Sequence, residues 1–132
     1  MNIDFINPPT LAPTFGWTQV VAATGGKTVY VSGQTSVDAE GLVVGKGDMR
    51  TQTRQTFENL KHALAAAGAT FDDVVKTNLY VVGLKLEHVP IIREIRSLYV
   101  SKDKPPTSTL VGVAALVHPD WLIEIEAVAV IS

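Results

Sequence analysis

The chain has 132 residues, of which 46% are apolar and only 18% charged, whereas soluble domains average about 25% charged residues. A chain of this length forms one core, so we expect a single domain over residues 1–132. The low charge suggests that another copy of the chain covers part of the surface in an oligomer. No stretch approaches the roughly 20 consecutive apolar residues that span a bilayer, so we expect no membrane partner.

The formal net charge of −2 and the absence of cysteine exclude further classes of protein. A nucleic-acid binder needs a basic face to neutralise phosphates, so no nucleic-acid partner is expected. Without cysteine there is no disulfide framework, no thiolate nucleophile and no cysteine-based metal site. A cytoplasmic location is compatible with this composition.

The first part of the chain shows the alternation of apolar and polar residues that is typical of β-strands. We predict strands at 17–24 and 27–37, and the second of them alternates strictly. The Gly25-Gly26 pair between them is typical of a two-residue hairpin turn with positive φ. A turn at 38–41 ends the second strand.

A helical period follows over residues 48–67, where apolar residues recur at spacings of three and four. Asp48 suits the N-cap of this helix and Gly68 its C′ position. Another β region is predicted at 72–83. The apolar stripe of the helix consists of Phe57, Leu60, Leu64 and Ala67.

The last part of the chain predicts one more helix and two strands. The helix covers about 87–100, with Pro90 in its first turn. Residues 101–106 end in two prolines and form a loop, and strands follow at 107–117 and 121–131. We expect the helix to bury Ile91, Ile92, Ile95, Leu98 and Tyr99.

The predicted order is therefore β-β-α-β-α-β-β, an α+β protein. Two helices cover only one face of such a sheet, yet both faces of the last strand are largely apolar. An antiparallel sheet that faces water shows polar residues on its outer side. We therefore expect the face without helices to pack against other subunits.

Two glutamates, Glu124 and Glu126, lie on the same face of the last predicted strand, between Leu122 and Val128. A carboxylate is costly to bury unless it is paired or hydrogen-bonded, and one with a raised pKa can exchange protons in catalysis. Two interpretations remain open. The glutamates form salt bridges with basic residues of a neighbouring subunit, or one of them is an acid/base catalyst.

The remaining motifs predict neither a metal nor another cofactor. His62, His88 and His118 lie on two different predicted helices and a turn, without the spacing of metal ligands. Gly26-Lys27-Thr28 is similar to the end of a phosphate-binding loop, but Val21 occupies the position of its first glycine.

Four segments, at 29–34, 52–60, 68–76 and 123–129, resemble the RidA (YjgF/YER057c/UK114) family. The resemblance covers nearly the whole chain in the same order. It implies a chorismate-mutase-like fold, with a mixed sheet and two helices on one face, in a homotrimer with a central β-barrel. It also implies clefts between subunits, where family members hydrolyse reactive enamines and imines to keto acids and ammonia.

The resemblance assigns roles to individual residues. Glu124 matches the acid that positions water and exchanges protons, and Gly33 matches a glycine whose backbone lines the cleft. The family's tyrosine falls on Trp17, whose indole can stack on a planar ligand but has no hydroxyl group. The family's cleft asparagine in the second helix falls near Ile92.

The chain departs from the family at the arginine that binds the substrate carboxylate. Ser108 occupies that position, and Leu110 stands where a cysteine is common. Because a charge-assisted hydrogen bond contributes about 1.5–3 kcal/mol, its loss weakens binding of a small imino acid by roughly one to a few powers of ten. The resemblance thus implies a less anionic ligand, with Arg93 and Arg96 as other candidate sources of positive charge.

Two functions are compatible with these residues. The first is a hydrolytic deaminase or tautomerase that acts on enamine or imine metabolites without the usual arginine. The alternative is a non-catalytic protein that binds a small molecule or regulates a partner. Ribonuclease activity, another label of this family, is disfavoured by the acidic charge balance.

Overall fold

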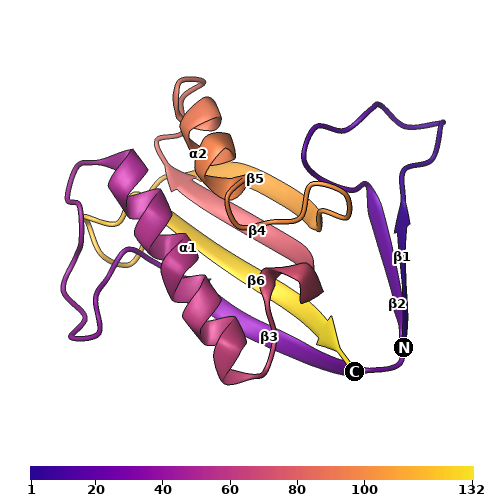
Figure 1. The fold of residues 1–132 in the computed structure, drawn as a ribbon. Coiled ribbons are helices and arrows are strands. Elements are labelled where there is room, and N and C mark those ends of the chain that lie inside the picture. Colours follow the sequence, from indigo (N-terminus) through magenta and orange to yellow (C-terminus); the bar gives the residue numbers. More distant parts are fainter.

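The computed structural model describes residues 1–132 as a four-stranded sheet with two helices in front of it and a separate two-stranded hairpin (Figure 1). The α+β class and the placement of both helices on one face, which the sequence predicted, are confirmed. The elements are β1 (Asn2–Ile6), β2 (Val20–Thr24), β3 (Lys27–Gln34), α1 (Met49–Ala66), the 3-10 helix η1 (Phe71–Asp73), β4 (Val74–Val82), α2 (His88–Arg96), β5 (Thr107–Val113) and β6 (Ile123–Ile131).

The main sheet is mixed, with the strand order β3-β6-β4-β5. The last strand, β6, lies inside the sheet and is antiparallel to both of its neighbours, whereas β4 and β5 are parallel. A parallel pair needs a crossover connection, and α2 lies in the segment that joins β4 to β5. This crossover places α2 beside the edge strand β5.

The core lies between α1 and the centre of the sheet. In β6 every second residue points toward the helices, and Ile123, Ile125, Ala127 and Ala129 are buried there. The intervening residues, including Glu124 and Glu126, point to the opposite side, which we call the helix-free face. Three residues of the predicted apolar stripe of α1 are buried completely or nearly so, namely Phe57, Leu60 and Leu64.

Both ends of α1 have the predicted caps. The Asp48 carboxylate accepts hydrogen bonds from the backbone N–H groups of Arg50 at 3.1 Å and Thr51 at 3.4 Å. These bonds lower the pKa of Asp48, together with a hydrogen bond from the Thr51 hydroxyl. Gly68, just after the helix, has a φ of 79°, a left-handed conformation that favours glycine.

The prediction of a β2–β3 hairpin at Gly25-Gly26 is wrong. β2 pairs instead with β1, a strand that the sequence analysis missed, and β3 pairs with β6. Both glycines have positive φ, and a Cβ atom on Gly26 would lie 2.6 Å from the carbonyl oxygen of Ile131. The pair therefore provides a tight link between two sheets, because a glycine turn does not determine which strands pair.

Several predicted elements are shorter in the structure. β3 ends at Gln34, α2 at Arg96 and β5 at Val113. Because α2 ends early, Leu98 lies beyond it and is 69% exposed, which contradicts its predicted burial. Neither helix has the length and apolar character that crossing a bilayer requires.

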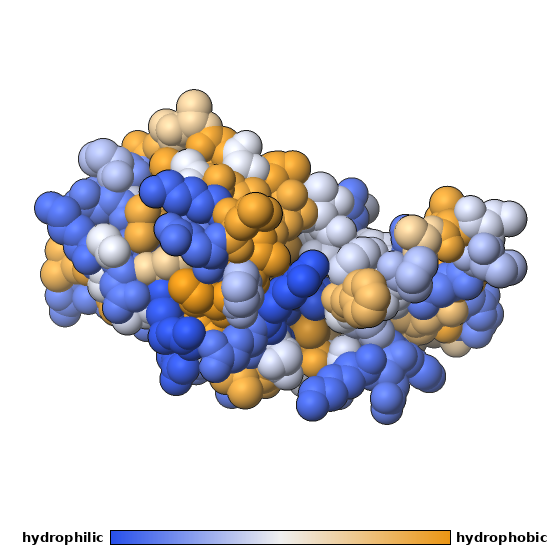
Figure 2. Space-filling model, turned by 90° about the horizontal axis from the view of Figure 1, so that it is seen from above, coloured by the Kyte–Doolittle hydropathy of each residue, from blue (hydrophilic) through white to orange (hydrophobic).

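The surface combines polar and apolar side chains, and Figure 2 shows the hairpin as a projection from the main body. The helix-free face is more polar than the last strand alone suggested, because β3 and β4 contribute Tyr30, Ser32, Lys76 and Asn78. Tyr30 is 80% exposed in the isolated chain.

Gln52 connects α1 to the start of β6. Its side chain is completely buried. The amide nitrogen donates to the carbonyl oxygens of Gly45 at 3.2 Å and Asp120 at 2.8 Å, and the amide oxygen accepts from the backbone N–H of Leu122 at 2.9 Å. These bonds hold the segment that leads into β6 against the helix.

We expect Gln52→Ala to lower the free energy of unfolding by about 2 kcal/mol, since it removes three hydrogen bonds and leaves partly buried backbone groups without those partners. Urea denaturation at a fixed protein concentration measures this loss. Gln55→Ala is the matched control, because Gln55 is only partly buried and donates to Asn59 alone; its effect should stay within about 0.5 kcal/mol. Equal losses in the two variants would contradict the role given to Gln52.

Candidate functional site

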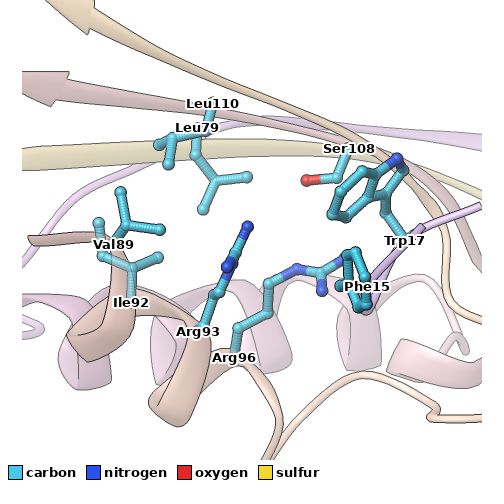
Figure 3. Close-up of a pocket in the computed structure, with 9 residues that line it drawn as sticks. All are labelled: Phe15, Trp17, Leu79, Val89, Ile92, Arg93, Arg96, Ser108 and Leu110. Carbon is cyan, nitrogen blue, oxygen red and sulfur yellow. The ribbon is translucent and has the colours of Figure 1, made fainter. Parts of the chain in front are cut away.

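A pocket of about 210 Å³ opens between α2, β4, β5 and the segment that precedes β2 (Figure 3). We call it the helix-side pocket. It brings together Trp17, Ile92, Ser108 and Leu110, which are four of the five residues predicted to bind substrate, and Gly33 is the one that lies elsewhere. Its complete lining is Phe15, Trp17, Leu79, Val89, Ile92, Arg93, Arg96, Ser108 and Leu110.

The pairing of β4 with β5 explains why Ser108 and Leu110 reach this pocket. Ser108 lies opposite Thr77, and Leu110 lies opposite Leu79. Thr77 and Leu79 are 2% exposed beneath the helices. Because paired residues of neighbouring strands share a face, Ser108 and Leu110 point toward α2.

Thr18 holds the Trp17 segment beside the start of β5. Its backbone N–H donates to the carbonyl oxygen of Pro106 at 3.1 Å, and its hydroxyl donates to that of Pro105 at 2.5 Å. Thr18 is 2% exposed. These two bonds position the indole of Trp17 over Ser108 on one side of the pocket (Figure 3).

Both candidate arginines of α2 line the same pocket. The guanidinium group of Arg93 projects into the space between Ile92 and Ser108 (Figure 3). Arg96 is 9% exposed and donates from Nη1 to the carbonyl oxygen of Gly16, while its buried Nη2 has no partner. Burial and the positive charge of Arg93 lower the pKa of Arg96. No carboxylate is present in the lining.

The other two predicted site residues, Gly33 and Glu124, lie together on the helix-free face. Gly33 lies where the pairing of β3 with β6 shifts, between Val31 and Gln34. A Cβ atom at Gly33 would lie 2.0 Å from Oε2 and 2.7 Å from Cδ of Glu124. Only glycine therefore allows the carboxylate to rest against this backbone.

Glu124 and Glu126 have different electrostatic environments. The hydroxyl of Tyr80 and the amide of Asn78, the latter at 3.2 Å, donate to Oε1 of Glu126 and lower its pKa. Burial, followed by the negative charge of Glu126, raises the pKa of Glu124. Glu126 is therefore stabilised as a carboxylate, while Glu124 takes up a proton more readily.

Tyr80 and Asn78 were not among the site residues predicted from the sequence. Tyr80 lies opposite Glu124, and Asn78 lies opposite Glu126, in the pairing of β4 with β6. These partners are 46 and 48 residues apart in the chain. The alternation of β4 marks a strand but does not say which strand lies beside it, so no local signal identified them.

The helix-side pocket and Glu124 lie on opposite faces of the same sheet. Ser108 faces the helices through its pairing with Thr77, whereas Glu126 and its neighbour Asn78 share the helix-free face. One copy of the chain therefore does not bring Glu124 to Ser108. The structure contains no group of three or more acidic or histidine side chains that could hold a metal ion.

We expect Gly33→Ala to displace the Glu124 side chain from its rotamer and to lower the free energy of unfolding by about 0.5–1.5 kcal/mol, because the new methyl group overlaps that side chain. In the Glu124→Ala background the overlapping atoms are absent, so most of this cost should disappear. Chemical denaturation of the four proteins in this cycle measures the coupling.

Gly112→Ala provides the control, since a Cβ atom there would meet Leu84 at 3.0 Å and not Glu124. Its cost should be the same with and without Glu124→Ala. A cost of Gly33→Ala that is also independent of residue 124 would show that the two residues do not interact.

Comparisons with known proteins show to which family the chain is similar. The sequence matches the family described as Endoribonuclease L-PSP over residues 9–131. The 3-aminoacrylate deaminase RutC of Acinetobacter baylyi is 36% identical over 123 residues, which cover 92% of this chain and 90% of the relative. The 2-iminobutanoate/2-iminopropanoate deaminase of Dermatophagoides farinae is 34% identical over 107 residues, 81% of this chain and 80% of the relative.

Solved structures share the fold. A protein of unknown function from Yersinia pestis, YyfB of the conserved Rid family, has a TM-score of 0.91 and 39% identity, and the match covers 99% of this chain and 100% of that one. RidA from an Antarctic Psychrobacter species has a TM-score of 0.71 and 33% identity, with 91% and 92% covered. Because sequence and fold agree over almost the whole chain, the protein belongs to the RidA (YjgF/YER057c/UK114) family.

Proposed function

We propose that this protein is a hydrolase that deaminates reactive enamine or imine metabolites in a cleft between subunits. The observation that carries the proposal is the carboxyl group of Glu124, which has a raised pKa and rests against Gly33. A carboxyl group with a raised pKa holds a proton more readily than an ordinary carboxyl group, which suits it to act as an acid as well as a base. The names of the Acinetobacter and Dermatophagoides relatives describe deaminases of an enamine and of imines.

The chemistry requires one group that both accepts and donates a proton. Glu124, as the carboxylate, accepts a proton from water while the water oxygen attacks the carbon of the protonated imine, which gives a carbinolamine. The protonated Glu124 then donates to the amine nitrogen. The carbon–nitrogen bond breaks as the carbinolamine hydroxyl gives its proton back to the Glu124 carboxylate, and ammonia leaves a carbonyl product. For an enamine, the protonated Glu124 first donates its proton to the β-carbon, which forms the protonated imine. Glu126 stays ionised through its bonds to Tyr80 and Asn78.

The division of the site across the sheet supports an assembly of several subunits, and the family resemblance implies that this assembly is a homotrimer with a central β-barrel. Within one chain, Glu124 and Ser108 face opposite sides of the sheet. A complete site therefore needs the helix-side pocket of one subunit to face Glu124 of another. This arrangement also accounts for the low charge of the chain, because the helix-free faces would be buried in the assembly.

The helix-side pocket would receive the body of the substrate. Trp17 can stack on a planar ligand, while Ile92 and Leu110 provide apolar walls. Ser108 can donate one neutral hydrogen bond, which is weaker than the paired bonds of an arginine. The pocket therefore suits a substrate with an apolar or aromatic side chain.

Replacement of Glu124 tests the catalytic assignment. We expect Glu124→Gln to reduce ammonia release from freshly generated 3-aminoacrylate and 2-iminopropanoate by about 10²- to 10⁴-fold, the range typical of a lost general acid/base. Ammonia is measured with a coupled dehydrogenase assay. Equal rates in the variant and the wild type would overturn the role of Glu124.

Glu126→Gln is the matched control, because it alters the neighbouring carboxylate on the same strand. We expect this variant to keep turnover, with the pH–rate profile displaced to lower pH. The reason is that the negative charge of Glu126, one of the two causes that raise the pKa of Glu124, is removed. A pH–rate profile that does not move would mean that Glu124 is not the titrating group.

A binding protein without catalytic activity is the second candidate, and the serine at position 108 favours it. Ligands that bind tightly without ammonia release by the wild type would support this alternative. The family description also mentions an endoribonuclease, but a net charge of −2 does not favour binding to a polyanion.

A further inference from the structure

The helix-side pocket contains two positive charges that nothing in the chain neutralises. The salt bridges of the chain join Lys46 to Asp120 and Arg50 to Glu94, and neither involves Arg93 or Arg96. The other pocket residues are apolar except for Ser108. Because unpaired charges near an apolar surface are costly, this pocket is suited to an anionic ligand.

Arg96 provides a second, independent sign of a missing ligand group. Its side chain is 9% exposed, and its Nη1 atom is held by the carbonyl oxygen of Gly16. The other terminal nitrogen, Nη2, is buried without an acceptor. A buried donor without a partner is rare in folded proteins. A carboxylate placed against the two arginines would provide both an acceptor and a counter-charge.

The position of the charges also limits the shape of the ligand. Both guanidinium groups come from α2, on the opposite side of the pocket from Ser108 of β5 (Figure 3). The space around them is bounded by the aromatic rings of Phe15 and Trp17 and by aliphatic side chains. The pocket therefore combines an anion-binding end with an apolar wall.

We propose that Arg93, together with Arg96, binds the carboxylate of an imino acid with an apolar or aromatic side chain. These two arginines of α2 would supply the positive charge that is missing from β5, where Ser108 occupies the position of the family's arginine. The proposal rests on the proposed function for its claim that the substrate enters this pocket. It also reverses the expectation of a less anionic ligand that followed from Ser108 alone.

Benzoate and benzamide are suitable probes, because they have nearly the same shape and differ in charge. Their binding to the intact oligomer is measured by NMR titration or calorimetry, so no turnover is needed. We expect the wild type to bind benzoate at least about tenfold more tightly than benzamide, since a charge-assisted hydrogen bond to a carboxylate accounts for such a factor.

Arg93→Gln should remove most of this preference, with about a 10- to 100-fold loss of benzoate affinity and little change for benzamide. Arg54→Gln is the matched control, because Arg54 is an exposed arginine of α1 outside the pocket; its preference should equal that of the wild type. Arg96→Lys keeps the charge but loses the forked donor group, so a smaller, benzoate-specific loss is expected.

Equal binding of benzoate and benzamide by the wild type would overturn the proposal, and so would an Arg93→Gln variant that keeps the full preference. A structure of the oligomer in which a carboxylate of a second subunit occupies the two arginines would also overturn it. The test is separate from that of Glu124. Unchanged ammonia release in Glu124→Gln would overturn the catalytic role of Glu124 but not the preference for benzoate. Absence of that preference would overturn the role of the arginines but not that of Glu124.

Discussion

The packing of α1 against β6, the strand near the centre of the main sheet, is the constraint on which the other features depend. Ile123 and Ile125 are completely buried beneath the helices. Because successive side chains of a strand point to opposite faces, this burial places Glu124 and Glu126 on the helix-free face. The alternation that builds the core thus also determines where the carboxylates lie.

The distribution of charge follows from this division of the sheet. On the helix-free face two carboxylates lie close together: burial and the negative charge of Glu126 raise the pKa of Glu124, whereas hydrogen bonds lower the pKa of Glu126. On the helix side two arginines line an apolar pocket that contains no acid. Such arrangements do not favour stability, and shifted pKa values of this kind are concentrated at functional sites.

Predictions from the sequence were correct where the contacts join residues close together in the chain, and wrong where they join distant segments. The helical period of α1 and its cap at Asp48 involve residues within a few positions of one another, and both were predicted correctly. The strand partners of Gly25-Gly26 and the burial of Leu98 depend on segments far away in the chain, and both predictions were wrong. Two glycines permit a tight turn. Which strands pair before and after that turn depends on other strands of the chain, here β1 for β2 and β6 for β3.

Local sequence patterns alone determined the family, the two helices and the strand that carries Glu124, together with the serine at position 108. Only the tertiary structure decided that Gly33 contacts Glu124, that Tyr80 and Asn78 bond to Glu126, and that the arginines of α2 share a pocket with Ser108. The physical reason is that local periodicity is set by backbone geometry, whereas these contacts depend on strand order, register and the crossover through α2. Those features are selected by the burial of the whole core, which no short segment encodes.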